Sequence, residues 1–314
     1  MKAAYKKNED FLDDVQNASE SPDDFHLWWL GQSGFLIKWG NQFILLDPYL
    51  SDSLTAKYSQ TEKPHVRITE QVIDPIKLSF VDLVTSSHNH TDHLDCETLT
   101  KISESSERTI KLVLPQANVG FANNRLRENP NIQLVGINES HPIAIGDFSI
   151  NGIAAAHNEI ERDENGNPKF MGLIISFGQW SIYHSGDTLW HPELTSELLK
   201  FSIDVAIVPI NGNKPERKVA GNLNGSEAAA ISKAINAKIA IPHHFDMFEF
   251  NTADPVEFTT ICNQLGQRFK VLQNGQRWSF SEIIFASASL ASCGVMSVSY
   301  THLRAHETGR NLVC

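Results

Sequence analysis

Three histidines and an aspartate fall within six consecutive residues of this chain. The six residues are His88, Asn89, His90, Thr91, Asp92 and His93, directly after a hydrophobic run at 81–85. Residues two apart in an extended segment project to the same side, so His88 and His90 are expected to hold one cation. The turn that follows would bring Asp92 and His93 toward a second cation. We prefer this two-metal interpretation to a solvated histidine-rich turn, because crowded imidazoles gain little without a metal.

Further candidate ligands follow the ends of other predicted strands. They are His157 after residues 148–156, Asp187 after residues 180–183, and His243 and His244 after residues 238–242. Only one of the two adjacent histidines should face a metal, because neighbours on an extended segment point to opposite sides. The two oxygens of Asp187 suit a bridge between cations. Loops at strand ends on a rigid scaffold are typical positions for such sites.

Other polar residues near these motifs have more than one interpretation. Asp47 ends a hydrophobic strand, where it either orients a ligand histidine or its loop or is a simple turn aspartate before Pro48. His184 is a candidate substrate contact or proton donor, or else a packed histidine. Residues 211–218 are either a solvated loop or a substrate loop in which Asn211 and Arg217 contact the substrate, with Arg217 or Lys214 meeting an anionic group.

Strands and helices alternate along the chain and must position these residues. Strands are predicted at 26–30, 34–39, 42–46, 81–85, 110–114, 148–156, 173–177, 180–183, 204–210, 238–242 and 269–273, and helices at 94–105, 225–237 and 254–265. Gly40-Asn41 indicates a hairpin turn, and Asn224 or Ser226 is the expected N-cap of the second helix. Each half contributes strands and then helices, which favours two sheets packed face to face with helices outside.

Composition narrows the class of protein. The chain has 314 residues, of which 41% are hydrophobic and 20% charged, as in a globular protein with a substantial core. The net charge of −11 and the absence of a basic stripe argue against nucleic acid as a partner. The four cysteines form no Cys-x-x-Cys pair, so oxygen and nitrogen must supply any ligands. With no hydrophobic run long enough to span a bilayer, we expect a cytoplasmic protein.

Three segments are expected. Residues 1–24 are an N-terminal extension, residues 25–282 form the main domain, and residues 283–314 are a tail. From residue 297 the tail resembles translated sequencing-adapter read-through, so we expect it to be disordered and exclude His302 and His306 from the site.

Several motifs together resemble the metallo-β-lactamase superfamily. They are residues 29–34 (Trp-Leu-Gly-Gln-Ser-Gly), the strand ending at Asp47, the cluster at residues 88–93, His157, Ser185-Gly186-Asp187 and Pro242-His243-His244. Within the superfamily the chain is most similar to the group that includes the L-ascorbate-6-phosphate lactonases, through residues 28–31, 183–187 and 236–242. The third motif, Ala156-His157-Asn158, is closer to the general superfamily pattern. The resemblance covers residues 25–280.

This resemblance implies an α/β fold, a four-layer αββα sandwich, with a dinuclear site. By the motif alignment, His88, His90 and His157 hold the first metal, Asp92, His93 and His244 hold the second, and Asp187 bridges them. The cofactors would be two divalent metal ions, zinc or manganese. Residues 31–34 lack the spacing of a dinucleotide fingerprint, so no organic cofactor is expected.

The expected activity is metal-dependent hydrolysis of a small-molecule lactone, ester, amide or phosphorylated substrate. Two cations would share a hydroxide that attacks a carbonyl or phosphoryl centre, while Asp92 orients it and accepts its proton. Two alternatives stay open: a phosphodiesterase of the phospholipase or nuclease kind, and a non-catalytic metal- or ligand-binding module. The expected partner is the substrate, and a homo-oligomer is left open.

Overall fold

The computed structural model describes residues 1–139, 141–217 and 219–282. The chain divides into a compact unit, Met1–Ser279, and a second segment, Phe280–Cys314. The strands and helices named here all belong to the first unit. The predicted tail at residues 283–314, with His302 and His306, lies outside the described residues.

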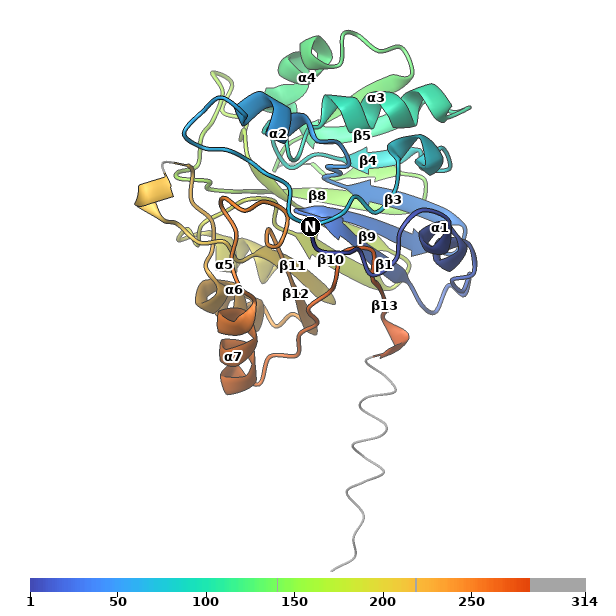
Figure 1. Cartoon of the computed structure of the whole chain (residues 1–314). Coiled ribbons are helices and arrows are strands. Elements are labelled where there is room, and N and C mark those ends of the chain that lie inside the picture. The colour runs from blue at the N-terminus through green and yellow to red at the C-terminus, as the bar shows by residue number, and fades with distance from the viewer. Residues whose placement is uncertain (140, 218, 283–314) are drawn as a thin grey trace, which may run out of the picture. The chain divides into compact units, whose positions relative to one another are not determined.

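The strands of the compact unit form two sheets (Figure 1). The seven-stranded sheet has the order β13-β1-β2-β3-β4-β5-β6, with bounds Arg277–Ser279, His26–Gly31, Gly34–Trp39, Gln42–Leu46, Leu83–Thr85, Ile110–Pro115 and Ile132–Ile137. The six-stranded sheet has the order β12-β11-β10-β9-β8-β7, with bounds Ile239–His243, Val205–Pro209, Trp180–His184, Met171–Phe177, Phe148–Ala154 and Ile143–Ile145.

Strand direction decides which loops meet. Strands β3 to β6 are parallel, as are β10, β11 and β12, whereas β8 and β10 each pair antiparallel with β9. The C-terminal ends of β3 and β4 therefore share one edge of the first sheet, and those of β8, β10 and β12 share one edge of the second. The predicted hairpin at residues 34–46 is confirmed, because Phe35 pairs with Leu46 and Gly40 adopts a φ of 55° in the turn.

Helices cover the outer faces of the sheets (Figure 1). They are α1 (Asn8–Gln16), α2 (Ser53–Tyr58), α3 (Cys96–Ser105), α4 (Val119–Arg125), α5 (Leu194–Leu198), α6 (Gly225–Ala234) and α7 (Val256–Leu265), with 3-10 turns at Pro75–Leu78, Gln116–Asn118 and Pro215–Arg217. Phe11 of α1 and Leu99 of α3 join Leu36 and Leu45 of the first sheet in one hydrophobic cluster. Helix α6 contacts β11, β12 and α7. None of the described helices has the length and hydropathy needed to cross a membrane.

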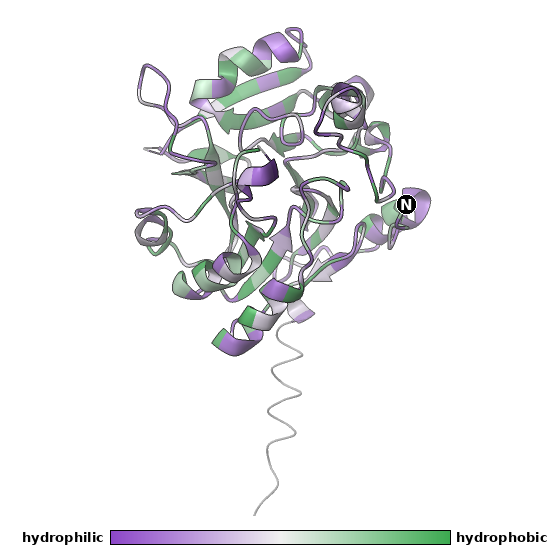
Figure 2. Ribbon diagram, turned by 60° about the vertical axis from the view of Figure 1, so that its left-hand side comes forward, coloured by the Kyte–Doolittle hydropathy of each residue, from purple (hydrophilic) through white to green (hydrophobic). Residues whose placement is uncertain are grey.

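The inner faces of the two sheets pack against each other. Trp39 of β2 contacts Phe177 of β9, with ring centroids 5.6 Å apart, and Phe35 of β2 lies 6.1 Å from the ring of His184 on β10. Figure 2 shows hydrophobic residues concentrated in the strands and hydrophilic ones in the connecting loops. The four-layer αββα sandwich predicted from the resemblance is confirmed.

Three details refine the sequence interpretation. The strand predicted at residues 269–273 is wrong, because only Phe269 forms a bridge, to Ala240, before the chain leaves the sheet; the last strand is instead β13. Asn224 is the N-cap of α6, where its side chain and that of Glu227 form a reciprocal capping box. Residues 1–24, the predicted extension, contain α1 and its buried Phe11, and are part of the compact unit.

Candidate metal centre

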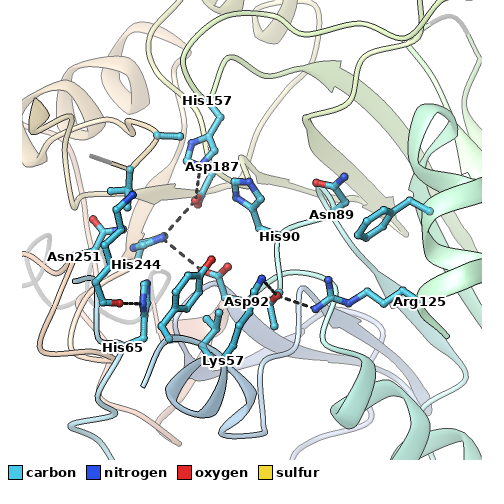
Figure 3. Close-up of a pocket in the computed structure, with 17 residues that line it drawn as sticks. Lys57, His65, Asn89, His90, Asp92, Arg125, His157, Asp187, His244 and Asn251 are labelled. Atoms are coloured by element: carbon cyan, nitrogen blue, oxygen red, sulfur yellow. Dashed lines mark hydrogen bonds and ion pairs between the residues drawn. The ribbon is translucent and has the colours of Figure 1, made fainter. Parts of the chain in front are cut away.

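Four loops bring the predicted metal-binding side chains together, and Figure 3 shows those of His90, Asp92, His157, Asp187 and His244. Strand β4 precedes the loop with His88, His90, Asp92 and His93, and strands β8, β10 and β12 precede His157, Asp187 and His244. The loops that follow these strands line the same cavity. His90 and His244, more than 150 positions apart in the chain, therefore lie close together. The parallel strands thus account for the assembly of the site.

The donor atoms form three overlapping groups. They are His88, His90 and His157; His88, His93 and Asp187; and Asp92, His93 and His244, each with ligand atoms within 4.8 Å of one another. All seven residues expected from the sequence belong to at least one group. The first and third groups are the two sets that the resemblance assigned to separate cations.

Asp187 lies between these two sets. Its Oδ1 is 3.5 Å from His93 Nε2, and its Oδ2 is 3.6 Å from His157 Nε2 and 3.4 Å from His244 Nε2. The residue is 3% exposed, so water does not screen these contacts. One carboxylate therefore faces imidazoles of both sets, which is the arrangement that a bridging ligand requires.

Asp47 fixes the orientation of His93. The completely buried carboxylate accepts hydrogen bonds from Ser87 N at 2.9 Å, from Ser87 Oγ, and from His93 Nδ1 at 2.7 Å. With Nδ1 donating to Asp47, Nε2 is the nitrogen of His93 that faces Asp187. Asp47 thus orients a histidine of the cluster, as one of the two sequence interpretations proposed.

Two more histidines are oriented in the same way. His157 Nδ1 donates to Gly221 O at 2.9 Å and to Asn222 Oδ1 at 3.1 Å, both of which only accept. Ser87 Oγ gives its proton to Asp47 and is 3.0 Å from His88 Nδ1, so His88 donates to it. In both histidines the Nε2 lone pair is left for another partner.

His243 and His244 diverge at the end of β12. His243 continues the strand into the interior, where its Nδ1 lies 3.0 Å from Ser33 Oγ. His244 has a φ of 61°, which turns its side chain out of the strand direction and into the cavity (Figure 3). The expectation that one histidine of this pair faces the other ligands agrees with this geometry, and His244 is that residue.

Gln32 is a site residue that sequence reasoning missed. It lies in the turn between β1 and β2, and its Nε2 donates to Asp92 Oδ2 at 2.9 Å and is 3.0 Å from His244 Nε2. Its place in the motif at residues 29–34, in the turn between two predicted strands, was the available signal. Gln32 therefore contacts both Asp92 and His244 and fixes their side chains relative to each other.

Buried polar atoms without hydrogen-bond partners show that this group of side chains fits a metal. Among the described residues, the buried His88 Nε2, His93 Nε2 and Asp187 Oδ1 have no hydrogen-bond partner, which is costly unless another group binds them. Burial and the neighbouring imidazoles hold the pKa of His88 well below its usual range, so His88 is neutral, as a metal-binding imidazole must be. Burial lowers the pKa of His93, but Asp187, Asp92 and Asp47 outweigh it and raise that pKa well above its usual value, so a metal at His93 Nε2 would take the place of a proton.

The cluster opens into a cavity of about 490 Å³, a size typical of small-molecule sites. Of the three expected substrate contacts, the structure brings none to this cavity. His184 is completely buried, donates to Ser33 O at 2.9 Å and stacks on His243. Asn211 is buried and bonded to Asn222. Arg217 donates to Asn211 O at 2.7 Å and to Thr252 O at 2.9 Å, so its guanidinium connects the loop at residues 211–218 to Thr252.

Cationic residues of the cavity were not expected from the sequence. Lys63 lines it, as do Lys57 of α2 and Arg125 of α4, and the last two both donate to the hydroxyl of Thr91. Neither Lys57 nor Arg125 belongs to a motif. Both lie on short helices that were not predicted from the pattern of hydrophobic residues. Cys96 and Cys262 do not line the cavity, in keeping with ligands of nitrogen and oxygen.

Comparison with known proteins identifies the family. Residues 26–244 match the family described as the beta-lactamase superfamily domain. A metal-dependent hydrolase of Thermoplasma acidophilum is 28% identical over 249 residues, covering 78% of this chain and 93% of the relative. A probable L-ascorbate-6-phosphate lactonase of Escherichia coli is 21% identical over 293 residues, covering 82% of this chain and 80% of the relative. The metallo-beta-lactamase fold protein YhfI of Bacillus subtilis has a TM-score of 0.61 at 17% identity, over 82% of this chain and 99% of that chain. Because the family match spans more than half of the chain, this protein belongs to the metallo-β-lactamase superfamily and is a metal-dependent hydrolase of that fold.

Proposed function

We propose that the chain hydrolyses a small-molecule lactone, ester, amide or phosphorylated compound at a dinuclear centre. The observation that carries this proposal is the position of Asp187 between two sets of imidazoles. His88, His90 and His157 would hold one cation, Asp92, His93 and His244 the other, and Asp187 both. Imidazole and carboxylate ligands suit zinc or manganese.

The residues around the proposed metal centre have different roles in hydrolysis. Bound divalent cations supply a Lewis acid and a water activated at neutral pH. Asp92 faces the cavity, and its side chain is 17% exposed, so its carboxylate can orient a water and accept a proton from it. Gln32 Nε2 keeps that carboxylate in place, and Asp47 keeps the proton of His93 on Nδ1.

The dimensions of the cavity favour a small substrate. Its walls combine hydrophobic Leu54, Tyr58 and Phe121 with polar residues near Asp92. The similarity to a probable L-ascorbate-6-phosphate lactonase supports a lactone as one substrate type. The phosphodiesterase and the binding module are the other outcomes of the experiment below.

The test combines metal analysis with a substrate panel. Purified protein is loaded with zinc or manganese and assayed on a lactone, an ester, an amide, a phosphomonoester and bis(p-nitrophenyl) phosphate. Asp92→Asn should lower kcat by about 100-fold or more, in the range of lost general-base catalysis. The matched control is Asp95→Asn, because Asp95 is a nearby buried aspartate whose carboxylate bonds to Thr98 and Ser53 instead.

Each outcome of the panel is decisive. Turnover of the lactone, ester, amide or phosphomonoester, lost in Asp92→Asn and kept in Asp95→Asn, supports the proposal. Turnover of the phosphodiester alone identifies a phosphodiesterase. A metal-loaded protein with no turnover on any compound is a binding module, and the proposal fails.

A further inference from the structure

Two cationic side chains lie beside the candidate metal centre, on the side of the cavity away from His157 (Figure 3). Lys57 Nζ is 3.3 Å and Arg125 Nη2 is 2.8 Å from the same atom, Thr91 Oγ1. Thr91 is the residue between His90 and Asp92. The two positive groups therefore converge on the loop that carries the metal ligands.

Within the described residues, neither charge has an acidic partner. No carboxylate of the described residues forms an ion pair with Lys57 or Arg125, although many other cations of this acidic chain are paired, as Lys6 is with Asp14. The acidic residues that line the cavity, Asp92 and Asp187, belong to the metal centre. A threonine hydroxyl accepts hydrogen bonds but carries no charge, so two positive charges are left facing the cavity.

The surroundings hold both side chains in place. The Lys57 ammonium lies 5.1 Å from the ring centre of Tyr58, and the Arg125 guanidinium lies 5.8 Å from that of Phe121. Cys96 Sγ donates to Arg125 O at 3.1 Å, which fixes the end of α4. Cations that are positioned before binding lose less entropy when an anion arrives.

We propose that Lys57, Arg125 and the Thr91 hydroxyl form a subsite for an anionic group of the substrate, a carboxylate or a phosphate monoester. A planar guanidinium binds either group through paired hydrogen bonds, and the ammonium adds a point charge. The substrate class is then a small hydrolysable compound with a negative group away from the scissile bond. This inference rests on the proposed hydrolytic function, and it moves the anion contact from Lys214 and Arg217 to α2 and α4.

The first arm of the test measures binding without turnover. Phenylphosphonate, benzoate and neutral benzamide are titrated by calorimetry into the metal-loaded wild type, Lys57→Met and Arg125→Met. Each substitution should weaken binding of the favoured anion about ten-fold or more, as expected for the loss of a hydrogen bond to a charged group, and leave benzamide unchanged. The stronger of the two anions identifies the group as phosphate or carboxylate.

The controls are Lys101→Met and Arg127→Met, which change the same residue types outside the cavity. Both should bind the anions within about two-fold of wild type. If Lys57→Met and Arg125→Met also bind them as tightly as wild type, the anions sit elsewhere, for instance on the metal ions, and the subsite is refuted.

The second arm measures selectivity in turnover. The ratio of kcat/KM for p-nitrophenyl hemisuccinate to that for neutral p-nitrophenyl butyrate should exceed one in the wild type and fall about ten-fold in Arg125→Met. A wild type that hydrolyses neither these esters nor any compound of the substrate panel, with anion binding lost in the variants, overturns the hydrolytic function and keeps the anion subsite. A wild type that hydrolyses both esters with the same ratio as Arg125→Met overturns the subsite and keeps the hydrolase.

Discussion

Replacing Asp47 by asparagine should weaken metal binding without touching a ligand. Asparagine keeps the shape of the side chain and one oxygen, which can still accept from Ser87 N. Its amide nitrogen then faces Ser87 Oγ and His93 Nδ1, both of which donate to the aspartate. The serine hydroxyl can rotate and accept from the amide, but His93 loses its acceptor and the reason to keep its proton on Nδ1.

The magnitude follows from that single lost bond. A hydrogen bond to a charged group contributes about 1.5–3 kcal/mol, and a substitution of this kind typically lowers metal affinity about 10- to 100-fold. Competition with a chromophoric chelator measures the affinity, and urea unfolding of the metal-free protein measures stability. The control Asp95→Asn should lose stability but keep its metal affinity, because Asp95 bonds to Thr98 and Ser53. Wild-type affinity in Asp47→Asn would refute the reasoning.

Three further predictions follow from other contacts. His244→Gln should lose bound metal, whereas His243→Gln should keep it, because His243 faces Ser33; equal metal loss in both, by elemental analysis, would contradict this. Burial raises the pKa of Asp14, but Lys6, Trp28 and Arg277 outweigh it and lower that pKa, so Asp14 stabilises the fold above its unfolded pKa and this contribution disappears as pH falls below about 4. Asp14→Asn should therefore flatten the acid limb of stability measured by urea unfolding between pH 7 and 3, and an unchanged limb would argue against it. Burial raises the pKa of the Cys262 thiol to about 12, so Cys262 should resist alkylation in the native protein at pH 8, which peptide mapping after iodoacetamide treatment can check.

The sequence was sufficient to predict the site residues whose positions depend on neighbouring residues in the chain. His88, His90, Asp92 and His93 are adjacent in the chain, so their proximity needed no knowledge of the fold. His157, Asp187 and His244 follow strands, and parallel strands bring their C-terminal ends to one edge. An N-cap of α6 at Asn224 or Ser226 and the β2–β3 hairpin could also be predicted, because Asn224 and Gly40 act on their immediate neighbours.

Features that depend on tertiary packing could not be predicted from the sequence. Arg217 lies in a polar stretch like that of a substrate loop, but its guanidinium binds backbone carbonyls that only the folded chain supplies. Lys57 and Arg125 are 68 positions apart on short helices, and only the packing of α2 and α4 brings both to Thr91. Strand β13 has three residues, too few for an alternating pattern, and forms because β1 offers an edge.

The stoichiometry of bound metal tests the central claim most directly. The wild type and Asp187→Ala are saturated with zinc or manganese, freed of excess ion, and analysed for metal per chain, with circular dichroism to verify that both are folded. The account predicts two ions per chain in the wild type and fewer in Asp187→Ala, because Asp187 contacts imidazoles of both sets. A wild type that saturates at one ion, or an Asp187→Ala variant that retains two, would contradict it.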